Sequence, residues 1–334
     1  MLVFAVVAAI ATTLIGWYAK PIGTALGLLD FPDDPGGRKL HGKVTPLVGG
    51  LALTGTVLAA IAATVAFSAA HSPSFARDLV RLGMAVGVMF LIGAADDRFE
   101  LSVRLRLAVA TAVLALAIGM VPDFALAFFR LGQSPVLILL GGLTVPFTLL
   151  SLVGLLNAVN MADGKNGIVI GMALLWSVFL LIHLPAAVLP IMTAVTTTLA
   201  VLFAFNLRGR LFLGDGGSYA VSALFGLLAI YAYNHDFAEV GADDVSLLFA
   251  IPVFDTLRLL VARIAQRRSP FAGGRDHLHH YLHARIGWPR GLYVYMALAA
   301  VPNIGAMLMP GSGLVWLAID LVAYASVLVW AQRR

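Results

Sequence analysis

The sequence predicts an all-α, polytopic integral membrane protein, on the basis of its composition and the spacing of its apolar runs. Hydrophobic residues make up 60% of the 334 residues, and charged residues make up only 12%. A water-soluble chain of this length needs more charge to cover its surface. Runs of about 17–24 almost uncharged residues recur along the chain, which is the length that a helix needs to cross roughly 30 Å of hydrocarbon.

About eleven membrane-spanning helices are expected. The first begins near the N-terminus, but it lacks a basic segment before it and a small-residue cleavage site after it, so we interpret it as a span and not as a signal peptide. The expected spans are 2–19, 46–69, 79–95, 105–121, 136–157, 167–184, 186–205, 216–233, 246–263, 291–309 and 313–331.

The distribution of basic residues predicts the orientation. Nineteen of the 22 Lys and Arg residues lie in or beside alternate loops, and only Arg77, Arg81 and Arg130 belong to the other set. Cytoplasmic loops are the basic ones in membrane proteins. We therefore expect the N-terminus outside, the C-terminus in the cytoplasm, and no nucleic-acid partner behind the net charge of +5.

The remaining global features are consistent with one membrane domain over residues 1–334. Cysteine is absent, which excludes disulfides and cysteine metal sites. No internal repeat is evident, which argues against a transporter built from inverted repeats. Polar residues gather at the cytoplasmic ends of the expected spans, so we place an active site on that face.

The segment AADDRFELS, residues 94–102, closes an expected span with two adjacent carboxylates, Asp96 and Asp97. Like charges this close require a cation or a retained proton. Oxygen ligands of this kind suit Mg²⁺, which takes one or two carboxylates and leaves its other positions to water and phosphate. The alternative is a solvated helix end paired with Arg98 and Arg104.

The segment NAVNMADGKNG, residues 157–167, spaces Asn157, Asn160 and Asp163 three residues apart. In a helix this spacing places the three side chains near one stripe. Asp163-Gly164 and Asn166-Gly167 are also typical of turns. A turn alone does not explain Asn157, which lies among apolar residues.

The segment FNLRGRLFLGDGGSYAVS, residues 205–222, sets Asp215 between two glycines and Ser218 at the start of a span. The N-terminus of a helix offers free backbone N–H groups to an anion, and small residues let a phosphate approach. The alternative is an N-cap or a helix-packing role for Ser218 and the glycines.

The loop RRSPFAGGRDHLHHYLHARIG, residues 267–287, holds four of the eight histidines. The positions of His279 and His283 permit a zinc pair on a helix, but an HEXXH motif is absent. The arginines of the loop oppose a bound cation and favour phosphate. We therefore expect a phosphate-handling loop, with zinc as the alternative.

Together these motifs resemble the polyprenyl-phosphate N-acetylhexosamine-1-phosphate transferase superfamily, glycosyltransferase family 4. The pattern His277-Leu278-His279-His280 after Ser269-Pro270-Phe271 is similar to the branch of bacterial undecaprenyl-phosphate GlcNAc-1-phosphate transferases. The resemblance covers nearly the whole chain, through RKLHGKVTPLVGG at 38–50, DDRFELS at 96–102, NAVNMADGKNG at 157–167, FNLRGRLFLGDGGS at 205–218 and PVFDTLRLLVARIAQRRSPFAGGRDHLHH at 252–280.

The resemblance implies transfer of a HexNAc-1-phosphate, GlcNAc-1-phosphate first among them, from a UDP-sugar to undecaprenyl phosphate, with release of UMP. It implies a bacterial inner-membrane enzyme, a bound lipid in the bilayer, a homodimer as one arrangement, and Mg²⁺ with Mn²⁺ as a substitute. The alternatives are the phospho-MurNAc-pentapeptide transferase branch and, in another class, a polytopic transporter.

The resemblance also implies roles for individual residues. Asp215 is the firmest expected metal ligand, and Asp97 or Asp96 either binds the metal or helps to deprotonate and orient the lipid phosphate. The expected catalytic residues are Asp96, Asp97, Asp163, His277, His279 and His280. The expected substrate-binding residues are Lys39, His41, Asn157, Asn160, Asn166, Asn206, Ser218 and Arg275, and the metal ligands are Asp215 and Asp97.

Two positions depart from the family pattern, and one acid lies outside it. Gly274 replaces an Asp that often precedes the Arg of the histidine motif, and Asn166 replaces a second Asp of the 157–167 motif. We expect altered substrate choice to originate first at Gly274. Asp320, alone in the last span, matches no family motif, and a packing role is expected for it.

Overall fold

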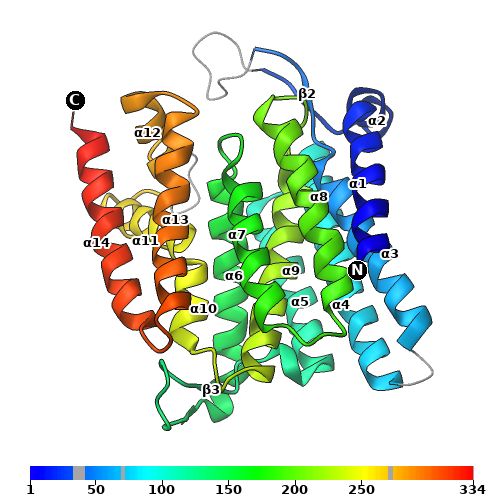
Figure 1. The fold of residues 1–334 in the computed structure, drawn as a ribbon. Helices are drawn as coiled ribbons and strands as arrows, with labels where there is room; N and C mark the ends of the chain where they lie inside the picture. The colour runs from blue at the N-terminus through cyan, green and yellow to red at the C-terminus, as the bar shows by residue number, and fades with distance from the viewer. Residues whose placement is uncertain (33–41, 69–71, 270–273, 334) are drawn as a thin grey trace.

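The computed structural model describes residues 1–32, 42–68, 72–269 and 274–333, and these are almost entirely helical (Figure 1). Two very short antiparallel hairpins add β1 (Leu29–Asp30) paired with β2 (Thr45–Pro46), and β3 (Phe128–Phe129) paired with β4 (Ile138–Leu139). The helices are α1 (Leu2–Trp17), α2 (Ala19–Leu26), α3 (Gly49–Ser68), α4 (Pro73–Phe99), α5 (Val103–Met120), α6 (Thr144–Ala162), α7 (Ile168–His183), α8 (Leu189–Leu207), α9 (Gly214–His235), α10 (Ala242–Leu248), α11 (Ala250–Ala265), α12 (Leu278–Ile286), α13 (Arg290–Leu308) and α14 (Gly313–Gln332), with 3-10 turns at Pro122–Phe124 and Gly141–Leu143.

The prediction of a multi-pass helical membrane protein is confirmed. Among the described residues, eight helical segments are long and apolar enough to cross a membrane, and two bent helix pairs raise that number to as many as ten. The predicted span 167–184 corresponds to α7, which has only 16 residues. The count of eleven and the direction of insertion therefore stay predictions.

The elements predicted to face the cytoplasm lie together. Helix α2, strand β2 and helix α12 lie at one end of the bundle, which we call the α12 end, and β3 lies at the opposite end (Figure 1). Segments that carry α2, β2 and α12 thus lie at one end of the molecule, and the candidate site is built there.

Both bent pairs break where a proline removes a backbone donor. Helices α1 and α2 meet at 72°, three residues before Pro21, and α10 and α11 meet at 74°, three residues before Pro252. Pro252 has no N–H for the carbonyl of Leu248, and Trp176 Nε1 donates to that carbonyl instead, at 2.8 Å. The segment expected as a span over 246–263 therefore bends at Phe249, before Asp255, and whether it crosses the membrane as one span stays a prediction.

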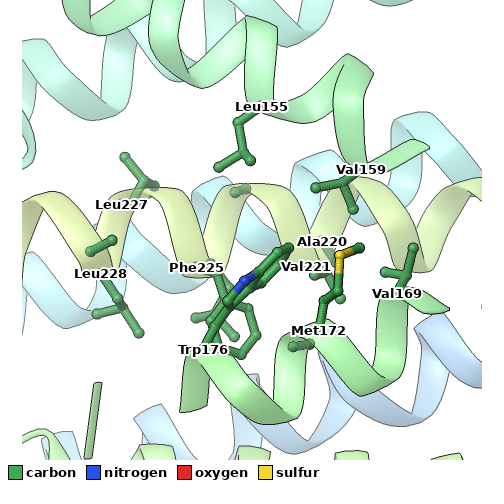
Figure 2. Close-up of a cluster of buried hydrophobic side chains, with 14 of the residues drawn as sticks. Leu155, Val159, Val169, Met172, Trp176, Ala220, Val221, Phe225, Leu227 and Leu228 are labelled. Atoms are coloured by element: carbon green, nitrogen blue, oxygen red, sulfur yellow. The ribbon is translucent and has the colours of Figure 1, made fainter. Parts of the chain in front are cut away.

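Helix α9 is the centre of the bundle. Of its most apolar 18-residue window, 94% is buried, against 22% for α5 and for α14. Figure 2 shows Leu155 of α6, and Met172 and Trp176 of α7, around Phe225 and its neighbours on α9. Trp176 meets Phe225 edge to face with ring centroids 5.6 Å apart, a favourable aromatic geometry.

Glycines let α3 and α4 approach the first turn of α9. A Cβ on Gly93 of α4 would lie 2.3 Å from the carbonyl oxygen of Asp215, and one on Gly50 would lie 2.4 Å from the nitrogen of Gly217. Helices in membranes associate through such close packing of small residues. This contact sets the C-terminal end of α4, with its two carboxylates, against Asp215.

We predict that Gly93→Ala lowers stability and Gly87→Ala does not. The added methyl at position 93 meets backbone atoms that cannot move aside, and overpacking of this kind costs about 1–3 kcal/mol. On the same helix, a Cβ at Gly87 meets only the tip of Leu58 at 3.9 Å. Thermal unfolding in detergent is the measurement, and equal unfolding temperatures for the two variants would contradict the packing described.

Candidate active site

The first part of the site is a carboxylate that caps a helix of a different segment. Asp97 Oδ1 accepts the N–H of Asp215 at 3.0 Å, and Oδ2 accepts the N–H of Gly216 at 3.1 Å. A carboxylate at a helix N-terminus satisfies its free donors and its positive dipole end. Asp97 therefore occupies the N–H groups at which a phosphate was predicted to bind, and the glycines there let the helices approach closely.

Asp96 is buried and pairs with an arginine that the sequence analysis overlooked. Arg106 Nη1 donates to Asp96 Oδ2 and lies 3.6 Å from Asp215 Oδ2. Arg98, proposed as a partner of the Asp doublet, donates instead to the carbonyl of Leu26 at 3.0 Å. A charged residue inside the expected span 105–121 was the available signal for Arg106, because ionisable groups in spans are costly.

Asn160 joins α6 to this carboxylate cluster. Its Nδ2 donates to Asp215 Oδ1 at 2.9 Å and to Ser218 Oγ at 3.0 Å. The hydroxyl of Ser218 donates to the carbonyl of Asp215 at 3.1 Å, and the residue is fully buried. Ser218 therefore positions Asp215, and its predicted contact with substrate stays a prediction. Asn157 donates to Val153 O of its own helix at 2.8 Å.

Asp163 follows α6 and links the carboxylates to the histidine loop. Burial, together with the negative charge of Asp97, raises the pKa of Asp163 from 3.8 to about 7. The next residue, Gly164, faces His279 so closely that a Cβ there would lie 2.3 Å from Nε2. The 157–167 and histidine motifs, more than a hundred residues apart, are thus in contact.

The histidine loop is held by a buried acid on α11. His277 Nδ1 lies 2.8 Å from Asp255 Oδ2, and the rings of His277 and His279 are stacked with centroids 5.4 Å apart. Both ring nitrogens of the buried His279 lack a hydrogen-bond partner among the described residues. Desolvation lowers the pKa of His279 well below 6.5 and that of His280 to about 4, so both rings are neutral at physiological pH.

Cationic groups complete this side of the site. Burial and the charge of Arg275 lower the pKa of Lys165, and Lys165 in turn lowers the pKa of His280. Lys165 and Arg275 thus lie close enough for their like charges to interact, a pairing that an anion can stabilise. Lys39 and His41, predicted to meet the lipid phosphate, lie outside the described residues.

Asn206 and Asn166 brace the loops. The Oδ1 of the buried Asn206 accepts the N–H of Gly167 at 2.7 Å, and its Nδ2 donates to Leu211 O at 3.1 Å. Its whole amide is thus used between two motif segments, which is a positioning role. Asn166 accepts Trp288 Nε1 on its backbone oxygen at 3.1 Å, and the functional role predicted for its side chain stays untested.

The donor set near α9 suits a hard cation, although no cage is preformed. Within the described ranges, no group of three or more His, Asp or Glu residues is arranged to hold a metal ion. Asp97 and Asp215 are oxygen donors on neighbouring helix ends, with Asp215 36% exposed. Two carboxylates without nitrogen or sulfur ligands fit Mg²⁺ shared with phosphate better than zinc.

Comparison with known proteins shows which family the chain resembles. Residues 79–233 match the family model described as Glycosyl transferase family 4. The chain is 25% identical to the "Probable undecaprenyl-phosphate N-acetylglucosaminyl 1-phosphate transferase" of Bacillus subtilis (strain 168), over 95% of this chain and 87% of that protein.

Enterobacterial proteins give the same result. The chain is 29% identical to the "Undecaprenyl-phosphate alpha-N-acetylglucosaminyl 1-phosphate transferase" of Escherichia coli (strain K12), over 89% of this chain and 80% of the relative. The protein of that name from Salmonella typhi is 28% identical, over 86% and 78% of the two chains. The resemblance inferred from five motifs is confirmed.

We predict that Gly164→Ala impairs turnover more than stability. The new methyl would push His279 away from the end of α6, and a displacement of about 1 Å at a reacting site can cost up to roughly a hundredfold in rate. We expect at least a tenfold loss of transferase activity. Gly154→Ala in α6 is the matched control, because nothing lies within 4 Å of its Cβ position. Equal activity of both variants would show that the close contact between Gly164 and His279 is not needed for turnover.

We predict that Asp163→Asn stabilises the metal-free protein at high pH. Because folding raises the pKa of Asp163 to about 7, its stabilising contribution is complete below pH 3.8 and is lost as the pH rises towards 7. At pH 8 the free energy of unfolding of the variant should exceed that of the parent by on the order of 1–3 kcal/mol. A tenfold change in proton affinity is worth about 1.4 kcal/mol, and solvent screens part of this effect because the carboxyl is half-buried.

The measurement is thermal unfolding in detergent with a chelator, at pH 4.5 and pH 8. At pH 4.5 the difference from the parent should be only about a quarter of the difference at pH 8. Glu239→Gln removes an exposed carboxylate in the acidic segment 234–245 and serves as the control. A gain for Asp163→Asn that is equal at both pH values would show that the charge is not its cause.

Proposed function

We propose that this chain, as a relative of glycosyl transferase family 4, transfers HexNAc-1-phosphate, most simply GlcNAc-1-phosphate, from a UDP-sugar to undecaprenyl phosphate. The products are undecaprenyl-diphospho-HexNAc and UMP. The observation that carries the proposal is the contact of four separate motifs at the α12 end, through Asp97–Asp215, Asn160–Asp215 and Gly164–His279. The names of the relatives support the lipid acceptor and the sugar phosphate.

The reaction joins an anionic acceptor to an anionic donor, so the protein must balance charge and align two phosphates. Asp96, Asp97 and Asp215 form an acidic group, and Lys165 and Arg275 form a basic group near the histidines. Arg106 neutralises part of the acidic side through Asp96 and Asp215. This division of charge supports a diphosphate lying between the two groups.

We propose that Asp215 and Asp97 hold Mg²⁺, with Mn²⁺ as a substitute. When bound, the ion neutralises negative charge on the donor's diphosphate and on the departing UMP. Asn160 fixes the carboxylate of Asp215, and the backbone N–H groups of α9 fix that of Asp97. Each carboxylate keeps lone pairs beyond those engaged in these bonds.

Asp163 is suited to accept or hold a proton at neutral pH, because its pKa of about 7 lies near the working range. We propose that it withdraws the last proton of the acceptor phosphate. Lys165 and Arg275 would then hold the incoming phosphate oxygens. His279 has both ring nitrogens without partners among the described residues, and it would donate to or accept from the donor sugar phosphate.

The isoprenoid chain requires an apolar surface that faces the bilayer beside the site. Helix α11 supplies one through Leu257, Val261 and Ile264, which are 51–66% exposed and share a helix face. Helix α11 packs against α6, whose C-terminal end carries Asn160 and Asp163. We propose that the lipid lies along this face, with its phosphate at the α12 end.

Two alternatives are less well supported. The phospho-MurNAc-pentapeptide transferase branch shares the reaction, but the relatives named above and the split histidine pattern favour the GlcNAc-1-phosphate branch. A transporter places its ionisable groups near the bilayer midplane, between halves of the molecule. Here the carboxylates and the histidines meet at one end.

The direct test is turnover by the purified chain, with undecaprenyl phosphate, Mg²⁺ and a panel of labelled UDP-HexNAc donors. We expect a lipid-linked product and release of UMP with at least one donor, and no product in the presence of a chelator. Absence of product from every donor, with uptake of a solute into vesicles, would favour the transporter.

We further predict that Asp215→Asn lowers turnover by at least a hundredfold while the protein still inserts and unfolds cooperatively. Loss of one group that stabilises developing charge typically costs 10²–10³ in rate. Glu239→Gln, far from the motifs in sequence, is the control and should retain full activity. Near-normal turnover of Asp215→Asn would remove this residue from the metal site.

A further inference from the structure

Asp255 is a buried acid that the proposed reaction does not yet use. It lies on α11, just after the bend at Phe249, and is 4% exposed. Its Oδ2 is 2.8 Å from Nδ1 of His277, which is 7% exposed. The N–H of Leu278 also donates to the Asp255 carboxylate, at 3.2 and 3.3 Å to its two oxygens.

Two further donors fix the other side of the same carboxylate. Tyr324 of α14 donates its hydroxyl to Oδ1 at 2.7 Å, and Arg258 Nη2 donates to Oδ1 at 2.9 Å. Arg258 also donates from Nε to the Tyr324 oxygen at 3.0 Å and from Nη2 to the carbonyl of Asp276. The carboxylate therefore cannot rotate without breaking several bonds, and neither can the ring that it holds.

A carboxylate accepts hydrogen bonds and has no proton to give when ionised, so the bond at 2.8 Å requires the proton on His277 Nδ1. The lone pair of the neutral ring then lies on Nε2. Within the described ranges, the His277 ring forms its hydrogen bond at Nδ1 and forms none at Nε2, and the ring lies beside those of His279 and His280.

We infer that Asp255 is a positioning residue of the transferase: it fixes the Nδ1–H tautomer of His277 and so presents Nε2 to the substrate. The inference rests on the proposed function for its consequence in turnover. In this state Nε2 accepts a hydrogen bond from a hydroxyl or amide N–H of the sugar. When Nε2 takes up a proton, the Asp255 carboxylate stabilises the imidazolium, which then donates to a phosphate oxygen. Neither step requires the ring to turn.

The network also connects α14 with the site. Tyr324 lies on the last helix, and its hydroxyl reaches both Asp255 and Arg258. His277 is thus held from α11 directly, and from α14 through the bond of Tyr324 to Asp255. Loss of the Tyr324 hydroxyl should loosen the carboxylate without removing it.

The experiment compares the full-length parent with Asp255→Asn, Tyr324→Phe and Asp243→Asn. Nitrogen-15 spectra of ring-labelled histidine report which nitrogen of His277 carries the proton, and the His277→Gln spectrum assigns the signal. Asp243 is the matched control: it is 2% exposed, and its carboxylate accepts the N–H of Gly132 at 2.7 Å and that of Leu314 at 2.9 Å, both far from the histidines in sequence.

We expect the Nδ1–H tautomer in the parent and in Asp243→Asn, and loss of its dominance in Asp255→Asn. Turnover should fall by roughly a hundredfold or more in Asp255→Asn and by less than tenfold in Tyr324→Phe, with KM for the UDP-sugar changed by less than threefold in both. Tyr324→Phe keeps the acid, so it provides the test if Asp255→Asn fails to fold.

An unchanged tautomer in Asp255→Asn, or an Nε2–H tautomer in the parent, would overturn the inference whatever the activity. An equal loss of turnover in Asp243→Asn would also overturn it, because a general loss of stability would then explain the effect. If no sugar nucleotide is turned over by the parent, the proposed function fails, but the spectra still decide the role of Asp255.

Discussion

The site depends on one interaction, the capping of α9 by the carboxylate of Asp97. Both oxygens of Asp97 accept backbone N–H groups from the first turn of α9, a helix 118 residues away in the sequence. The bond is attainable only because Gly93 and Gly216 let the two backbones touch. It consumes donors that otherwise attract a phosphate and directs the side chain of Asp215 outward, towards Asn160 and Arg106.

Charge is the constraint that follows from this arrangement. Three carboxylates at adjoining helix ends raise one another's energy, and Arg106 balances them only in part. On the other side, burial and the charge of Arg275 lower the pKa of Lys165, and desolvation lowers the pKa of His280. The acidic and the basic groups come from different motifs, and this charge pattern is the basis for proposing that a magnesium diphosphate lies between them.

The sequence predicted the helices well and their contacts poorly. Each expected span contains a helix because apolar length alone determines a crossing segment. The bend at Phe249 was not predicted. Pro252 indicates that a backbone donor is missing, but the sequence does not show that Trp176 supplies the replacement donor to the carbonyl of Leu248. The sequence motifs identified most of the site residues. They did not predict three contacts: Arg106 with Asp96, Asp97 with the first turn of α9, and Asp255 with His277. The partners in these contacts lie 10 to 118 residues apart, and no local pattern specifies them.

The predicted substrate-binding and catalytic residues are of two kinds in the structure. Some lie where the motifs meet, and others hold neighbouring residues in place. Ser218 and Asn206 are buried and use their polar atoms on neighbouring backbone or side chains. Asn160, Asp163 and His279 converge where the motifs meet. A buried polar group in a membrane protein must find partners. A motif in such a chain therefore contains residues that position others as well as residues with free polar atoms, and His279, buried with both ring nitrogens lacking described partners, is of the second kind.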